Sequence, residues 1–156
     1  MSRTARPTPP PGAAITTVRH HIAFYETDAM GIVHHSNYVR FLELSRVEFM
    51  AQHDRAYTAY VEEGFHIPVT RALVHYHRPC RFADPLDVTC WLKWARSASL
   101  GFAYRLMVGD VLAATAETDH AFITQQGTPT RMPEHMRQRI HGWLGAAQGP
   151  TDGSAE

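Results

Sequence analysis

The pattern of hydrophobic and polar positions changes its period near residue 37, and this change separates a strand from a helix. From Thr16 to Tyr25 the side chains suited to a covered face recur every second residue: Val18, His20, Ile22 and Phe24. From Tyr38 to His53 the repeat is helical and predicts about four turns of helix. Asn37 stands directly before that helix and is a favourable N-cap residue.

Four later segments have strand character and are separated by turn signals. Their predicted ranges are Pro68–His77, Leu86–Arg96, Ser99–Val108 and Val111–Gln125. Gly109-Asp110 joins the last two and is short enough for a hairpin turn. A final helix is predicted from Pro133 to Leu144, since proline is tolerated in a first helical turn.

This order of elements predicts an α+β fold, in which an antiparallel sheet of about five strands wraps around a long central helix and a short C-terminal helix follows. The length of 156 residues fits one domain. We assign this domain to residues 15–144. The proline-rich residues 1–14 and the small, polar residues 145–156 are expected to be disordered tails.

The composition argues against several functional classes. Fifteen Lys and Arg residues balance fifteen Asp and Glu residues, so no overall field attracts nucleic acid or a membrane surface. No apolar stretch approaches the roughly 20 residues of a membrane span, and the first residues lack the apolar core of a secretory signal. Glycine-rich phosphate loops are absent. Cys80 and Cys90 form neither a disulfide framework nor a zinc motif, which indicates a reducing, cytoplasmic location.

The segment from Tyr25 to Tyr38 is the strongest candidate for a functional site, because it joins a carboxylate, a glycine and a histidine pair to the start of the long helix. Asp28 is expected near the positive end of the helix dipole, where developing negative charge is stabilised. Its carboxylate can act as a covalent nucleophile or as a general base that activates water. An ordinary turn aspartate is the alternative interpretation.

This segment resembles the active-site motif of the hotdog-fold acyl-CoA thioesterases of the 4-hydroxybenzoyl-CoA thioesterase family, including their Tol-Pal-associated relatives. The likeness extends to Phe41-x-Glu43, to the stretch from Arg78 to Leu86 and to the turn Arg96-Ser97-Ala98-Ser99. It covers roughly Thr16 to Leu144. The resemblance implies an acyl-CoA thioester hydrolase that assembles as a homodimer or homotetramer and uses no metal or other cofactor.

The resemblance also implies roles for individual residues. Asp28 corresponds to the catalytic carboxylate. His35 is its partner, either through a side chain that polarises the carbonyl, orients water or protonates the thiolate, or through a backbone N–H that stabilises the oxyanion. The residues expected to contact substrate are His34, as a wall of the acyl pocket, together with Asn37, Tyr38, Arg96, Ser97 and Ser99. Asn37 is further expected to cap the helix and so fix the loop.

Coenzyme A also needs cations for its phosphates, which arginine can grip with two parallel N–H donors. The turn that contains Arg96 is the preferred anchor, because the matching turn in relatives lies near the nucleotide. Further candidates are Arg78, Arg81 and Arg131.

Several alternatives remain open. The substrate could be an acyl group on a carrier protein, or the chain could be a non-catalytic acyl-CoA-binding subunit. His75-x-His77 places two imidazoles on one strand face, but no further zinc ligands accompany them, so no metal site is expected. Glu43 can line the site or form an inward salt bridge. The acyl group is undetermined, since the aromatic and methionine residues suit either an aryl slot or an aliphatic tunnel.

Overall fold

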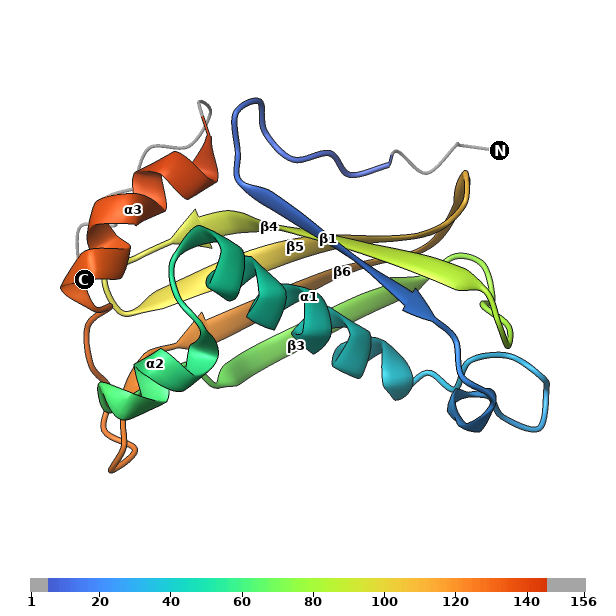
Figure 1. The fold of residues 1–156 in the computed structure, drawn as a ribbon, viewed down its shortest axis with the longest axis horizontal. Helices are drawn as coiled ribbons and strands as arrows, with labels where there is room; N and C mark the ends of the chain where they lie inside the picture. The colour runs from blue at the N-terminus through green and yellow to red at the C-terminus, as the bar shows by residue number, and fades with distance from the viewer. Residues whose placement is uncertain (1–5, 146–156) are drawn as a thin grey trace.

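Figure 1 shows a curved sheet wrapped around one long helix, in a computed structural model that describes residues 6–145. The five strands of the sheet are β1 (Ile15–His21), β3 (Val69–Tyr76), β4 (Pro85–Ala95), β5 (Ser99–Val108) and β6 (Val111–Ala121). They pair antiparallel in the order β1-β4-β5-β6-β3, so β1 and β3 are the edges. The predicted α+β architecture is confirmed.

The central helix α1 (Asn37–His53) buries one stripe against the sheet, since its covered residues recur three or four apart: Tyr38, Phe41, Leu42, Ser45, Phe49 and Met50. The remaining elements are a 3-10 turn η1 (Phe24–Glu26), α2 (Tyr57–Glu62), α3 (Glu134–Leu144) and a small sheet of β2 (Phe65–His66) and β7 (Ile123–Thr124). Within residues 6–145 no helix is long and apolar enough to cross a membrane.

The strand predicted from Thr16 to Tyr25 is shorter than expected. β1 ends at His21, and the side chain of Phe24 is 75% exposed. The cause is local, because the Glu26 carboxylate accepts a hydrogen bond from the Ala23 N–H at 2.8 Å and closes the turn η1. The two-residue period therefore holds only up to this turn.

Beyond β1, two differences from the prediction are larger than one residue at the end of an element. The segment Val111–Gln125 divides into β6 and β7 at Phe122, whose N–H donates to the Ala98 carbonyl at 3.1 Å rather than extending β6. Helix α2 and the small sheet are absent from the prediction, because six residues and two residues are too short for a periodic signal.

Residues 6–14 belong to the segment expected to be a disordered tail, and they lie along the domain. The Ala14 N–H donates to the Trp143 carbonyl at 3.1 Å, and Arg105 donates to the Pro7 carbonyl at 3.3 Å. Residues 1–5 and 146–156 lie outside the described residues, so the assignment of the tails stays a prediction there.

A chain of polar groups is buried between α1 and the sheet. Arg46 donates to the Tyr104 hydroxyl at 3.4 Å, the Tyr104 and Thr118 hydroxyls are 2.7 Å apart, and the Thr118 hydroxyl lies 2.8 Å from His120 Nε2. His120 is 1% exposed. Desolvation, with the Arg46 charge as the second cause, lowers the pKa of His120 to about 4. The imidazole is therefore neutral at pH 7.

We expect His120 to make the fold sensitive to acid. Its folded pKa of about 4 lies below the ordinary value of 6.5, so the unfolded chain binds this proton more tightly. The neutral His120 makes its full contribution to the free energy of unfolding above a pH of about 6.5. This contribution, about 3 kcal/mol, is lost as the pH falls toward 4. Unfolding free energies measured across this pH range should fall less steeply in His120→Gln than in the wild type. Equal slopes would contradict the assignment.

Candidate active site

The loop that carries Asp28 is closed by backbone hydrogen bonds. The Asp28 N–H donates to the Ile32 carbonyl, and the Gly31 N–H donates to the Asp28 carbonyl, both at 2.9 Å. Gly31 has φ of +73°, a conformation that favours glycine. Thr27 and Val33 form a β-bridge at the base of the loop. The turn is therefore well defined on both sides of the carboxylate.

The Asp28 carboxylate is half-buried and has one oxygen free for chemistry. Oδ1 accepts a hydrogen bond from the Met30 N–H at 2.8 Å. Oδ2 has no hydrogen-bond partner among the described residues. Asp28 lines a cavity of about 340 Å³ together with His35, Tyr38, Tyr76 and other residues. The structure therefore brings four of the sequence-predicted residues, Asp28, His35, Tyr38 and Arg78, to one cavity.

His35 lies one residue before the N-cap of α1, at the positive end of the helix dipole. Its carbonyl accepts hydrogen bonds from the Tyr38 N–H at 3.3 Å and the Tyr76 hydroxyl at 3.2 Å. Its own N–H has no acceptor within residues 6–145. The backbone is thus held in place while its donor stays available, as an oxyanion site requires.

The expectation that Asn37 caps the helix is wrong. The N-cap residue is Ser36, and no side chain makes a capping hydrogen bond there. Asn37 is already helical, so its side chain points back to the loop and donates from Nδ2 to the Glu26 carbonyl at 2.8 Å. Asn37 still fixes the loop to the helix, but through the chain before Asp28 rather than through the free helix N–H groups.

Glu26 organises the same loop and is missed by the sequence analysis. The residue is 8% exposed, and its carboxylate contacts His20 Nε2 at 2.8 and 3.0 Å. Its carbonyl accepts from the His34 N–H at 2.9 Å as well as from Asn37. A glutamate three residues after Ala23 is the signal that could have found it, since that spacing is typical of a capping box.

Tyr76 is a second residue that sequence reasoning misses. Its ring packs edge-on against Tyr38 with centroids 4.8 Å apart. Tyr38 is buried, and desolvation, with the Cys80 thiol next, raises its pKa. Both rings form walls of the Asp28 cavity. No sequence pattern links Tyr76 to this site, because it lies at the far end of β3 and reaches the loop only through the sheet.

Other predicted contact residues lie elsewhere. His34 is half-buried, its Nδ1 lies 2.7 Å from the Ser36 hydroxyl, and the centroids of its ring and the His35 ring are 4.1 Å apart. It does not line the Asp28 cavity.

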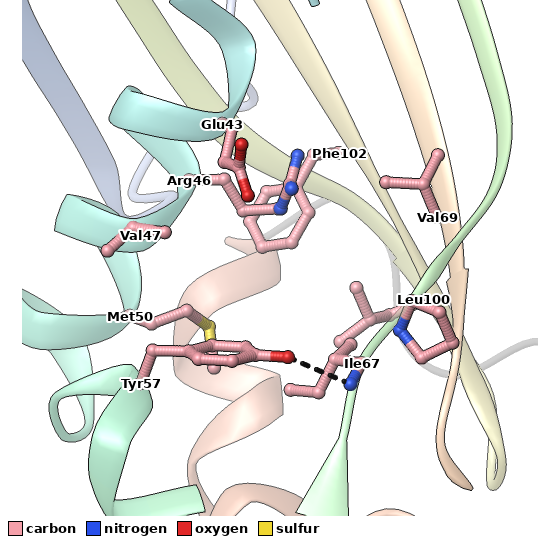
Figure 2. A pocket seen from close by; sticks show the side chains of 10 residues that line it. Glu43, Arg46, Val47, Met50, Tyr57, Ile67, Val69, Leu100 and Phe102 are labelled. Atoms are coloured by element: carbon pink, nitrogen blue, oxygen red, sulfur yellow. Dashed lines mark hydrogen bonds between the residues drawn. The ribbon is translucent and has the colours of Figure 1, made fainter. Parts of the chain in front are cut away.

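Glu43 faces a second cavity, beside α1 (Figure 2). The inward salt bridge, one of the two alternatives for Glu43, is absent, since no cation of residues 6–145 lies within 4.0 Å of its carboxylate.

The turn between β4 and β5, which contains Arg96, lies at the opposite end of the sheet from the loop between β1 and α1, which contains Asp28 (Figure 1). The Asp28 loop adjoins the start of β4, while Arg96 follows its end. With eleven residues in β4 and about 3.3 Å per residue, these ends are roughly 33 Å apart along the strand. One chain therefore does not bring Arg96, Ser97 and Ser99 to Asp28.

Two other cations lie at the Asp28 end. Arg78 lines the Asp28 cavity, and Arg81 donates to the Gly31 carbonyl at 3.4 Å. Across residues 6–145 no three His, Cys, Asp or Glu side chains are grouped so that they could hold a metal ion.

Comparisons with known proteins agree with this architecture. The model of the thioesterase-like superfamily matches residues 22–140. A putative esterase of Aquifex aeolicus is 33% identical over 118 residues, which are 76% of this chain and 91% of that protein. The acyl-CoA thioester hydrolase YbgC of Escherichia coli is 31% identical over 86 residues, 55% of this chain and 64% of that protein.

Among solved structures, a hypothetical protein of Thermus thermophilus has a TM-score of 0.78 and 30% identity, over 82% of this chain and 96% of that one. The curved sheet around a central helix is the hotdog fold, and the family match makes the chain a thioester hydrolase of this fold. The chain belongs to the thioesterase-like superfamily.

Proposed function

We propose that the chain hydrolyses acyl-CoA thioesters to the free acid and coenzyme A, with Asp28 as the reacting carboxylate. The observation that carries this proposal is the pairing of two free groups at one cavity, the Asp28 Oδ2 and the His35 N–H, within the described residues. Relatives named as acyl-CoA thioester hydrolases support coenzyme A as the thiol.

Two mechanisms use the same geometry. As a nucleophile, Oδ2 attacks the thioester carbon, the C–S bond breaks, and the thiolate leaves with a proton from solvent or a neighbouring acid. Water then hydrolyses the mixed anhydride and restores the Asp28 carboxylate. As a general base, Asp28 instead removes a proton from the water that attacks the same carbon. Either route places negative charge on the former carbonyl oxygen.

The His35 N–H is the proposed donor to that oxygen. It lies at the start of α1, where the helix dipole also favours negative charge. Loss of one such donor typically raises the barrier by about 2.7–4 kcal/mol. The exposed imidazole of His35 can add a second contribution by protonating the thiolate.

His35→Ala separates these two contributions, because it removes the imidazole and keeps the backbone N–H. If the side chain protonates the thiolate, kcat should fall about a hundredfold or more, and the lost activity should be accompanied by loss of one limb of the kcat pH profile. Retention of most of kcat in the variant would leave only the backbone role. Thiol release measured across pH distinguishes the two results.

For the phosphates of coenzyme A, we propose Arg78 and Arg81 as anchors on the chain that supplies Asp28. Both lie at the Asp28 end of the sheet and are exposed. The predicted anchor, Arg96 with Ser97 and Ser99, could reach the same substrate only from a second chain, because it lies at the other end of its own sheet.

A homodimer supplies that second chain. In residues 6–145 the strand β3 pairs only with β6 and leaves its other edge open. An open edge with few charges is a template for pairing with another strand, and both edges fit, since β1 and β3 each carry one arginine and no acidic residue. β3 is the edge whose Tyr76 lines the Asp28 cavity. We therefore propose that two copies join through β3. Assembly of two such dimers into a tetramer stays a prediction.

The proposed chemistry needs only a carboxylate, backbone donors and water, so we propose no metal or other cofactor. The free and buried state of Cys80 and Cys90 suits the proposed cytoplasmic location.

A thiol-release assay over short, long and aromatic acyl-CoAs tests the proposed hydrolysis. Release of free thiol that depends on Asp28 supports it. Acyl groups on carrier proteins should be assayed beside the same acyl groups on coenzyme A, since a marked preference for the carrier would favour that alternative. Binding of intact acyl-CoA with no release would favour a non-catalytic binding subunit.

A further inference from the structure

A second cavity, of about 210 Å³, lies between α1 and the start of β3 (Figure 2). Most of its walls are apolar, from Val47, Met50, Ile67, Val69, Leu100 and Phe102. Glu43 and Arg46 project toward the same space from α1, and Tyr57 closes it below. The cavity therefore combines an apolar interior with one cation and one carboxylate.

The guanidinium of Arg46 lacks an acidic partner in the described part of the chain. Its hydrogen bond there goes to the Tyr104 hydroxyl at 3.4 Å. Burial raises the pKa of Tyr104 and lowers that of His120, so the groups behind Arg46 are neutral at pH 7. Glu43 is exposed and lies beyond ion-pair distance. Arg46 thus faces the cavity with most of its five N–H donors unused.

The proposed dimer would join this cavity to the Asp28 site of the other copy. When β3 pairs with itself about a two-fold axis, antiparallel alignment of the whole strand sets Val69 beside Tyr76 of the partner subunit. Val69 lines the Arg46 cavity, and Tyr76 lines the Asp28 cavity. The two cavities are therefore neighbours across the interface, although each chain holds them at opposite ends of β3.

We propose that the Arg46 cavity receives the far end of the acyl group whose thioester is held at Asp28 of the partner subunit, and that Arg46 selects acyl groups ending in a carboxylate. This inference rests on the proposed hydrolysis and names its substrate class. Arginine binds carboxylates through two parallel N–H bonds, and a methylene chain suits the apolar walls.

The volume limits the length of this group. An apolar cavity of about 150 Å³ holds a benzene molecule. A cavity of about 210 Å³ therefore accommodates roughly six to eight carbons in compact form. Medium-length dicarboxylic acyl groups satisfy both the size and the charge of the cavity.

Matched thioesters test the selection. Adipyl-CoA and hexanoyl-CoA, and likewise suberyl-CoA and octanoyl-CoA, have equal carbon counts and differ in the terminal carboxylate. The wild type should show a higher kcat/KM for the dicarboxylic member. Arg46→Met should lower this preference ratio by about tenfold to a hundredfold, and Arg46→Lys should retain part of it. Glu43→Gln should raise the ratio, because it removes a like charge.

Arg40→Met is the matched control, since it removes a cation from an exposed position of the same helix that lines neither cavity. Its ratio should equal that of the wild type. A wild-type preference for the uncharged thioesters, or an equal loss on both members of each pair in Arg46→Met, would overturn the proposal.

Mixed dimers test which chain supplies Arg46. Co-expression of differently tagged Asp28→Asn and Arg46→Met chains gives a dimer in which one site combines an intact Asp28 with an intact Arg46 from the other chain. Such dimers should regain the wild-type preference ratio. If Arg46 serves the Asp28 of its own chain, the ratio will stay that of Arg46→Met, and the arrangement across two chains will be overturned.

Failure of this inference and failure of the proposed function give different results. Absence of thiol release from every acyl-CoA by the wild type contradicts hydrolysis itself. Release without a preference for the terminal carboxylate contradicts only the role of Arg46.

Discussion

Asp28→Asn is expected to lower kcat by at least about a hundredfold to ten-thousandfold, the range for loss of a general base, and by more if Asp28 is the nucleophile. The fold should survive, because the amide oxygen of asparagine can still accept the hydrogen bond that the Met30 N–H donates to Oδ1. What the substitution removes is the negative charge on the oxygen that has no partner in the described chain. Thiol release under saturating acyl-CoA measures the effect.

Asp110→Asn provides the control for this experiment. It makes the same chemical change at an exposed position of the β5–β6 hairpin and should retain wild-type turnover. Unfolding curves for Asp28→Asn that coincide with those of the wild type would show that lost activity is not lost structure. Full turnover by Asp28→Asn would contradict the assignment of Asp28 as the reacting carboxylate.

An isotope experiment distinguishes the two mechanisms. In oxygen-18 water, label found in the Asp28 carboxylate after turnover would identify the nucleophile mechanism.

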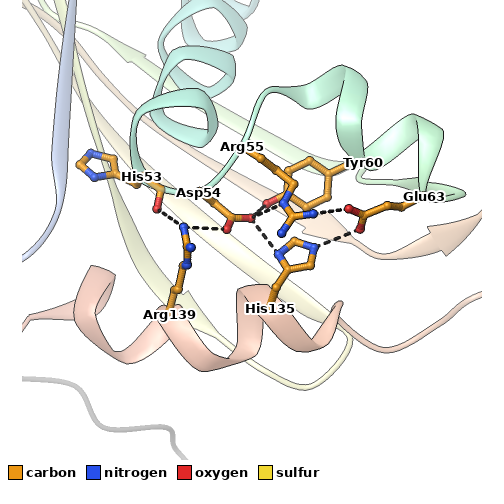
Figure 3. A network of polar contacts seen from close by, with 7 residues as sticks. All are labelled: His53, Asp54, Arg55, Tyr60, Glu63, His135 and Arg139. Atoms are coloured by element: carbon orange, nitrogen blue, oxygen red, sulfur yellow. Dashed lines mark hydrogen bonds and ion pairs between the residues drawn. The ribbon is translucent and has the colours of Figure 1, made fainter.

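The second large effect is expected on stability, at a polar network that joins all three helices (Figure 3). Asp54 follows α1, and its side chain is fully buried. Its carboxylate accepts a hydrogen bond from Tyr60 of α2 and forms an ion pair with Arg139 of α3 at 3.2 Å. Nδ1 of His135, also in α3, lies 3.1 Å from the same carboxylate. Arg55 lies 3.7 Å away. Three helices thus depend on one carboxylate.

Asp54→Ala should lower the free energy of unfolding by about 3–5 kcal/mol, the range for removing one partner of a buried ion pair. The loss leaves the Tyr60 hydroxyl and the charged groups around it without their acceptor. Burial, with Asp54 next, raises the pKa of Tyr60, so its hydroxyl stays a neutral donor that needs an acceptor. Urea unfolding measures the change, and the melting temperature should fall by about 10 °C or more.

Arg137→Ala is the matched control on α3, because it breaks an exposed ion pair with Glu134. Its effect should stay within about 0.5 kcal/mol. Asp54→Asn keeps the shape and one of the two acceptor oxygens but removes the charge, so its effect should be intermediate. If Asp54→Ala and Arg137→Ala destabilise the protein equally, the buried network does not hold the helices together.

Local patterns predicted the regular elements well. The strand predicted from Ser99 to Val108 has the observed bounds, and the long helix differs from its prediction by one residue at its start. Each element buries one face, and the hydrophobic residues of that face recur along the sequence with the period of a strand or a helix. The prediction of β1 was wrong beyond His21, because the turn at Glu26 depends on a side-chain contact that overrides the two-residue period.

The site was predictable only in part, because some of its residues are close in the chain and others meet only through the sheet. Asp28 and His35 follow one another within a single loop, so the chain itself keeps them close. Tyr76 reaches that loop from another strand, and Arg96 is carried to the far end of β4. Their places depend on which strands pair and on the direction in which each strand runs, and these are decided by contacts between segments that lie far apart in the sequence.

The sequence by itself determined the alternation of strands and helices and the loop that presents a carboxylate at a helix start, since both depend on neighbours in the chain. The tertiary structure decided that Asn37 ties the loop to Glu26, that Tyr76 supports His35, and that Arg46 faces a cavity without an acidic partner in the described residues. The contacts of Tyr76 and Arg46 join distant segments, whose distances are set by strand pairing and core packing rather than by position along the chain. The contact of Asn37 is closer in sequence, but it depends on how the loop folds back onto the helix.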